Sequence, residues 1–130
     1  MASRHVDTVI HRSPDEVYAY ARDLGNLPRW AAGLAEGEVH RTGDDALVVD
    51  SPMGRVTVAF APENRFGVLD HAVTRPSGEV VDNPMRVLAH PDGAEVLFTI
   101  RQGAMSDAEL ERDAALVAAD LHRLKTLLEG

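Results

Sequence analysis

Residues 5–24, HVDTVIHRSPDEVYAYARDL, contain a direct change from a strand pattern to a helix pattern. Residues 5–11 alternate β-branched and polar side chains, as a half-buried strand does. The alternation stops before Ser13, which can cap a helix, while Pro14 suits the first helical position and Glu16 can bond back to the cap. The stretch therefore predicts a strand followed at once by a short helix. The apolar face of that helix comprises Val17, Tyr20, Ala21 and Leu24.

Turn-forming residues divide the middle of the chain into short elements. Residues 27–34, with Pro28 near their start, predict a second and shorter helix. From residue 38 to residue 103 the pattern has period two, and its breaks cut six strands. Connections this short require neighbouring strands to run antiparallel. The breaks lie at residues 42–45, 51–54, 62–64, 75–78 and 90–93.

A long C-terminal helix is the clearest predicted element. Ser106 and Glu109 form a capping-box pattern, and apolar residues then recur at spacings of four and three. A coiled coil would show similar spacing, but the pattern covers fewer than three heptads and the six strands need a cover for their apolar face. Packing against the sheet is therefore the better interpretation. The apolar positions are Leu110, Ala114, Val117, Leu121, Leu124 and Leu128.

The composition fits a single cytoplasmic domain over residues 1–130. The formal net charge is −8 and the basic residues are scattered, so we expect no nucleic-acid partner. The chain has no Cys, which excludes disulfides and Cys-ligated metal centres. No apolar run approaches about 18 residues, so membrane insertion is not expected. His5 and His11 lie six residues apart on one predicted strand, too far to share a metal, and His40, His90 and His122 fall in other elements. No phosphate-binding glycine loop is present, so we expect neither a metal nor a cofactor.

Several stretches resemble one known superfamily. Residues 10–20, IHRSPDEVYAY, resemble the strand-to-helix entry of the START-related and birch-pollen-allergen-like superfamily, called SRPBCC, and residues 27–30, LPRW, resemble its Leu-Pro-x-Trp helix. Residues 83–87 and 103–109 are similar to the small bacterial polyketide cyclase/dehydrase-like branch. The resemblance implies an α+β helix-grip fold, in which a seven-stranded curved antiparallel sheet wraps around the long C-terminal helix, with two short helices after the first strand.

The same resemblance implies a cavity between the sheet and the long helix. Ligand cavities usually measure about 300 to 1,000 Å³ and are mostly apolar. Only 5% of the residues are aromatic, so few large side chains are available to fill the centre. The alternative is that apolar side chains of the long helix fill it.

Strand alternation identifies candidate site residues. In residues 68–73 the face that bears Leu69 and Val73 also bears His71, which makes His71 the candidate acid/base; a face assignment displaced by one residue would put Asp70 inside instead. A polar side chain on such a face needs a partner, since burying it unpaired costs about 1 to 3 kcal/mol. Each candidate also has a structural interpretation, as a core or turn residue. The candidate ligand-binding residues are Trp30, Tyr20, Asn83, Met85, Val87, Leu69, Val73 and Leu121.

Three functions follow from these features. The first is binding of a small hydrophobic molecule, similar to a lipid, a polyketide or an aromatic compound, by a carrier or sensor. The second is a polyketide cyclase or dehydratase-like enzyme that relies on confinement and one cavity acid/base. The third is a protein-interaction module with a vestigial pocket. An open sheet also leaves edge strands that a second copy could cover, so a homodimer stays an alternative.

Overall fold

The computed structural model describes residues 1–31, 39–51 and 54–130. Strand β1 (Ser3–Ile10) leads into helix α1 (Pro14–Arg22), the short 3₁₀ helix η1 (Leu24–Asn26) and helix α2 (Leu27–Trp30). Residues 32–34, the rest of the predicted second helix, lie outside the described residues. The remaining elements are β2 (Val39–Arg41), β3 (Ala46–Ser51), β4 (Gly54–Phe60), β5 (His71–Thr74), β6 (Val80–Asn83), β7 (Met85–His90), β8 (Gly93–Arg101) and α3 (Asp107–Glu129).

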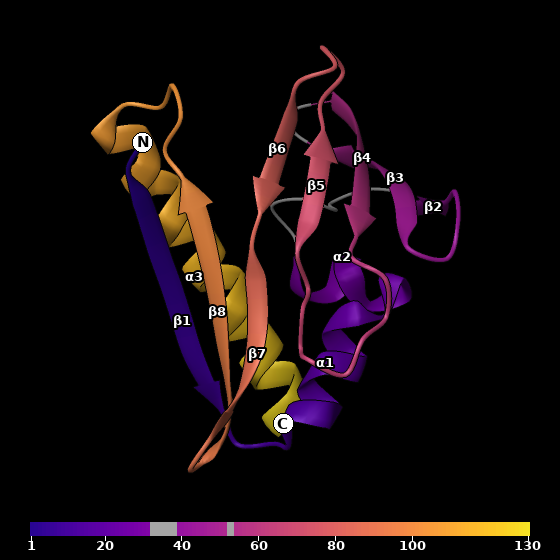
Figure 1. Cartoon of the computed structure of the whole chain (residues 1–130), viewed down its shortest axis with the longest axis vertical. Coiled ribbons are helices and arrows are strands. Elements are labelled where there is room, and N and C mark those ends of the chain that lie inside the picture. Colours follow the sequence, from indigo (N-terminus) through magenta and orange to yellow (C-terminus); the bar gives the residue numbers. More distant parts are fainter. Residues whose placement is uncertain (32–38, 52–53) are drawn as a thin grey trace.

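The strands form two antiparallel sheets that continue into one another. One sheet has the order β1-β8-β7 and the other the order β2-β3-β4-β5-β6. They meet where the segment before β5 approaches β7, with a bridge between Val68 and Arg86 and a 2.9 Å hydrogen bond from the Val87 amide to the Gly67 carbonyl. Helix α3 lies behind β1, β8 and β7, and α1 and α2 lie at the lower end of β4 and β5 (Figure 1). This arrangement confirms the predicted α+β helix-grip class.

The strand count differs from the predicted seven, because the structure has eight strands in the described ranges. The predicted single strand over residues 79–89 is divided at Pro84 into β6, which pairs with β5, and β7, which pairs with β8. Proline has no amide hydrogen for a sheet ladder. The Pro84 carbonyl still accepts a 2.9 Å hydrogen bond from the Thr99 amide, so contact with β8 begins at Pro84, directly before β7.

Helices α1 and α3 both begin with the capping hydrogen bonds that the sequence predicts. The Ser13 hydroxyl accepts from the Glu16 amide at 3.2 Å. At the start of α3, the Ser106 hydroxyl accepts from the Glu109 amide at 3.1 Å and the Ser106 amide donates to the Glu109 carboxylate at 3.0 Å. Helix α3 packs on β1, β8 and α2. Its buried residues are Leu110, Ala114, Leu121 and Leu124, while Val117 and Leu128 are half-buried.

We expect Gly67→Ala to destabilise the fold where the two sheets meet. Gly67 has φ +71°, and a Cβ atom there would lie 2.2 Å from the Val87 carbonyl oxygen. The substitution should lower the free energy of unfolding by about 2 kcal/mol or more. Urea denaturation of the purified variant measures this loss.

Gly43→Ala is the matched control, because its Cβ would meet nothing within 4 Å. The control should stay within about 0.5 kcal/mol of the parent protein. Equal losses in the two variants would contradict the role assigned to Gly67.

Candidate functional site

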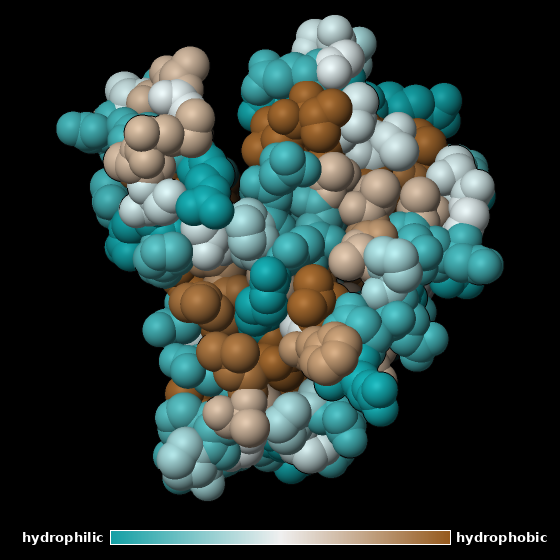
Figure 2. Space-filling model, in the orientation of Figure 1, coloured by the Kyte–Doolittle hydropathy of each residue, from teal (hydrophilic) through white to brown (hydrophobic). Residues whose placement is uncertain are grey.

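A cavity of about 160 Å³ lies between α2, the strands β4, β5, β6 and β8, and α3. The exposed side chains of Arg75 and Leu116 mark its mouth. Figure 2 shows the surface hollowed between the start of α3 and the hairpin that joins β5 and β6. The lining residues are Leu27, Trp30, Ala31, Phe60, His71, Val73, Arg75, Val81, Asn83, Phe98, Asp113, Leu116, Val117, Asp120 and Leu121.

The cavity is smaller than the size expected from the sequence. Aromatic side chains are scarce in the chain, but three of its six Phe, Trp and Tyr residues gather in this wall, namely Trp30, Phe60 and Phe98. The low aromatic content of the chain therefore does not produce a large cavity, because half of the aromatic rings lie in the cavity wall between the sheet and α3. A volume near 150 Å³ with an apolar lining is enough for a single benzene-sized ring.

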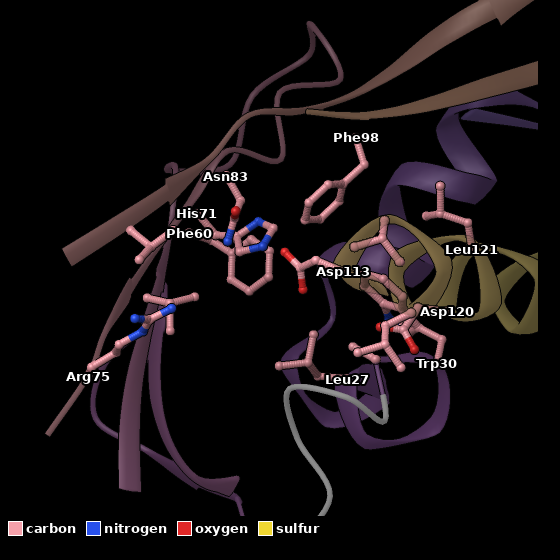
Figure 3. A pocket seen from close by; sticks show the side chains of 15 residues that line it. Leu27, Trp30, Phe60, His71, Arg75, Asn83, Phe98, Asp113, Asp120 and Leu121 are labelled. Atoms are coloured by element: carbon pink, nitrogen blue, oxygen red, sulfur yellow. The ribbon is translucent and has the colours of Figure 1, made fainter. Parts of the chain in front are cut away.

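His71 is the buried polar group of the cavity wall. Its side chain is only 6% exposed, which agrees with the inward face predicted for it. The ring packs against Phe60, with ring centres 4.9 Å apart, and against the edge of Phe98, with ring centres 5.6 Å apart. Figure 3 shows the imidazole among these rings, pointing into the cavity.

The hydrogen bond of His71 sets its tautomer. Nδ1 lies 3.0 Å from the Leu69 carbonyl oxygen, and a carbonyl can only accept, so Nδ1 carries the hydrogen and donates it. Burial lowers the pKa of His71 below its ordinary value of 6.5, against smaller opposing effects of the Leu69 carbonyl and Asp70. The ring is therefore neutral near pH 7, and Nε2, which has no hydrogen-bond partner among the described residues, is a hydrogen-bond acceptor and a base.

Asp113 is a site residue that the sequence analysis did not identify. It lies half-buried on α3, and its carboxylate points into the cavity toward His71 and Phe98 (Figure 3). Burial raises the pKa of Asp113, and the charge of Arg75 opposes that shift. Spacing on α3 was the available signal, because Asp113, Val117 and Asp120 lie three or four residues apart on the flank of the apolar stripe.

The other charged residues of the wall have partners. The Arg75 guanidinium lies 3.3 Å from the Glu79 carboxylate across the β5–β6 turn. Asp120 forms an ion pair with Arg123 one turn further along α3. The Arg123 side chain also donates to the Trp30 carbonyl at 3.4 Å, which joins α3 to α2 beside the cavity.

The structure brings together part of the predicted site. His71, Trp30, Asn83, Val73 and Leu121 line the cavity.

Four other predicted ligand-binding residues lie outside it. Leu69, Met85 and Val87 are buried in the core, and Tyr20 is half-buried against it. The reason is that α1 contacts β7 and β8, so the inward face of β7 is covered by a helix rather than by the cavity. Alternation indicates the buried face of a strand but not what covers that face.

Residues 1–31, 39–51 and 54–130 contain no group of three His, Asp or Glu side chains placed to hold a metal ion. In the same ranges, no helix is both long and apolar enough to cross a membrane.

Solved structures of similar shape share little sequence with this chain. DynU16, from the dynemicin biosynthetic locus, has a TM-score of 0.74 and 16% identity, over 98% of this chain and 47% of that one. The chain thus spans about half the length of DynU16. The Aha1 dimer of Colwellia psychrerythraea has a TM-score of 0.75 and 14% identity, over 96% and 94% of the two chains. Ara h 8.0201 has a TM-score of 0.67 and 9% identity, over 99% of both chains.

A comparison with curated protein sequences gave no match. The family model described as polyketide cyclase / dehydrase and lipid transport, in contrast, matches residues 1–129. That match extends from β1 to the end of α3 and includes every residue of the cavity wall. The chain therefore belongs to the polyketide cyclase / dehydrase and lipid transport family.

Proposed function

We propose that this protein binds a small hydrophobic molecule in the cavity between the sheet and α3, as a carrier or sensor. The observation that carries the proposal is the lined space of about 160 Å³, in which aromatic and aliphatic side chains surround a few inward polar groups. This combination is typical of small-molecule sites, where the apolar wall supplies affinity and the polar groups fix orientation. The family to which the chain belongs includes lipid transport in its description, which supports the proposal.

The size and lining of the cavity favour a ligand, or a ligand segment, of about one ring. Phe60 and Phe98 present ring surfaces to the space, and Val73 and Leu121 supply aliphatic contacts. Displacing water from such a surface gives about 25 cal/mol for each Å² of apolar area buried. A polar group on the ligand would find the neutral Nε2 of His71 and the Asn83 amide on the same wall.

Trp30 provides a direct measurement of binding, since it is the single Trp of the chain and lines the cavity. Titration with ethylbenzene should change the Trp30 emission and saturate. Val73→Phe fills the cavity from β5 and should weaken binding by about tenfold or more, which corresponds to 1.4 kcal/mol.

Thr74→Phe is the matched control, because residue 74 neighbours Val73 on β5 but does not line the cavity. This variant should bind ethylbenzene as the parent protein does. The absence of any saturable change in the parent, or equal weakening in both variants, would show that the cavity is not the binding site.

A second candidate function is proton transfer to or from a bound substrate. The unpartnered Nε2 of His71 favours it, because a neutral imidazole in an apolar wall can take a proton from a confined carbon acid. The candidate reaction class is a cyclisation or dehydration that begins with removal of a hydrogen next to a carbonyl. Confinement would hold the reacting atoms close together.

Deuterium exchange at the methyl group of acetophenone tests this candidate. The parent protein should accelerate the exchange over buffer, and His71→Asn should abolish the acceleration. The lowered pKa of His71 gives the pH dependence: the base is neutral and active near pH 7, and the acceleration is lost only as pH falls below the ordinary value of 6.5. His90→Asn, at the end of β7 and outside the cavity wall, should leave the rate unchanged. An acceleration that survives His71→Asn would exclude His71 as the base.

A further inference from the structure

Not every charged side chain of the cavity wall has an ion-pair partner among the described residues. Arg75 pairs with Glu79, and Asp120 pairs with Arg123, so each of these charges has an opposite charge beside it. His71 is neutral near pH 7. Asp113 forms no ion pair within 4.0 Å among the described residues. The wall therefore carries one negative charge, that of Asp113, that no ion pair among the described residues neutralises, although the charge of Arg75 acts on it.

The surroundings of Asp113 make its ionised carboxylate unfavourable in free energy when no cation in the cavity pairs with it. The carboxylate is half-buried and faces the apolar wall that contains Phe60 and Phe98 (Figure 3). A carboxylate in such a place loses part of its hydration, and either a proton or a cation must compensate for the loss. Arg75 is the nearest cation of the wall, but its guanidinium is engaged by Glu79.

We propose that the cavity takes a small ring-bearing amine, whose ammonium group pairs with the Asp113 carboxylate while the ring packs against the aromatic wall that contains Phe60 and Phe98. The proposal rests on the proposed binding function and names its ligand class. It follows from the unpaired carboxylate, the aromatic wall and the volume of about 160 Å³.

Two other polar groups of the wall can accept a hydrogen bond from an ammonium ion, whereas the buried indole N–H of Trp30 can only donate. An ammonium group has hydrogens to donate and no acceptor. Besides Asp113, the wall offers Nε2 of His71, which can only accept, and the side-chain oxygen of Asn83. Aromatic faces attract cations as well, by about 0.5 to 2 kcal/mol. A carboxylate ligand would instead meet the negative charge of Asp113.

Benzylamine and ethylbenzene form the test pair, because they have nearly the same shape and differ in charge. Both are titrated near neutral pH with the Trp30 emission as readout. Asp113→Asn should weaken benzylamine binding by about tenfold or more, as expected for a charge-assisted hydrogen bond, and leave ethylbenzene binding unchanged. Glu111→Gln removes the same charge from α3 at a position paired with Arg4, away from the cavity, and should leave both affinities unchanged.

The outcomes separate this proposal from the binding function itself. Ethylbenzene binding without benzylamine binding, or equal effects of Asp113→Asn on the two ligands, would overturn the amine assignment and leave the cavity as a hydrophobic site. Tighter binding of benzoate than of benzylamine would also overturn it, since Arg75 would then determine the ligand charge. If none of the three molecules binds, both proposals fail.

Discussion

The pairing of β1 with β8 is the contact on which the rest of the structure depends. It joins the first strand to the last along all eight residues of β1, from Ser3 opposite Arg101 to Ile10 opposite Ala94. Because β8 also pairs with β7, it is the central strand of its sheet. Helix α3 leaves the end of β8 and returns across both β1 and β8. The two ends of the chain are thereby held in one layered unit.

The cavity is a consequence of this arrangement. Helix α3 packs closely on β1 and β8, whereas β4, β5 and β6 belong to the second sheet and curve away from it. Pro84 marks the point where the chain changes from one sheet to the other. The space that remains between α3 and the second sheet is lined by Trp30 of α2 and, on the sheet side, by Phe60 and His71.

Partial removal from water shifts the pKa values of two cavity side chains, His71 and Asp113. Burial lowers the pKa of His71 and raises the pKa of Asp113, so both shifts disfavour the charged form. A ligand that brings a positive charge would relieve the cost at Asp113, and a ligand that brings a hydrogen-bond donor would satisfy Nε2 of His71. The two proposed functions, ligand binding and proton transfer, thus rely on the same wall.

The sequence alone was sufficient to predict most of the helices and strands and many of the side chains that are buried. The capping residues Ser13 and Ser106, the apolar spacing of α3 and the inward side of His71 all depend on local periodicity and hydrogen bonding, which short stretches of chain contain. Trp30, Val73, Asn83 and Leu121, four of the predicted ligand-binding residues, also lie in the cavity wall.

Only the tertiary structure decided which buried residues face empty space and which face another element. Met85 and Val87 have the same alternation as Val73, yet α1 lies near β7 and they became core, whereas β5 faces the cavity. Asp113 belongs to the site for a similar reason, because the flank of α3 on which it lies is turned toward the second sheet. Periodicity identifies the buried side of an element, but what covers that side depends on contacts between residues far apart in the chain.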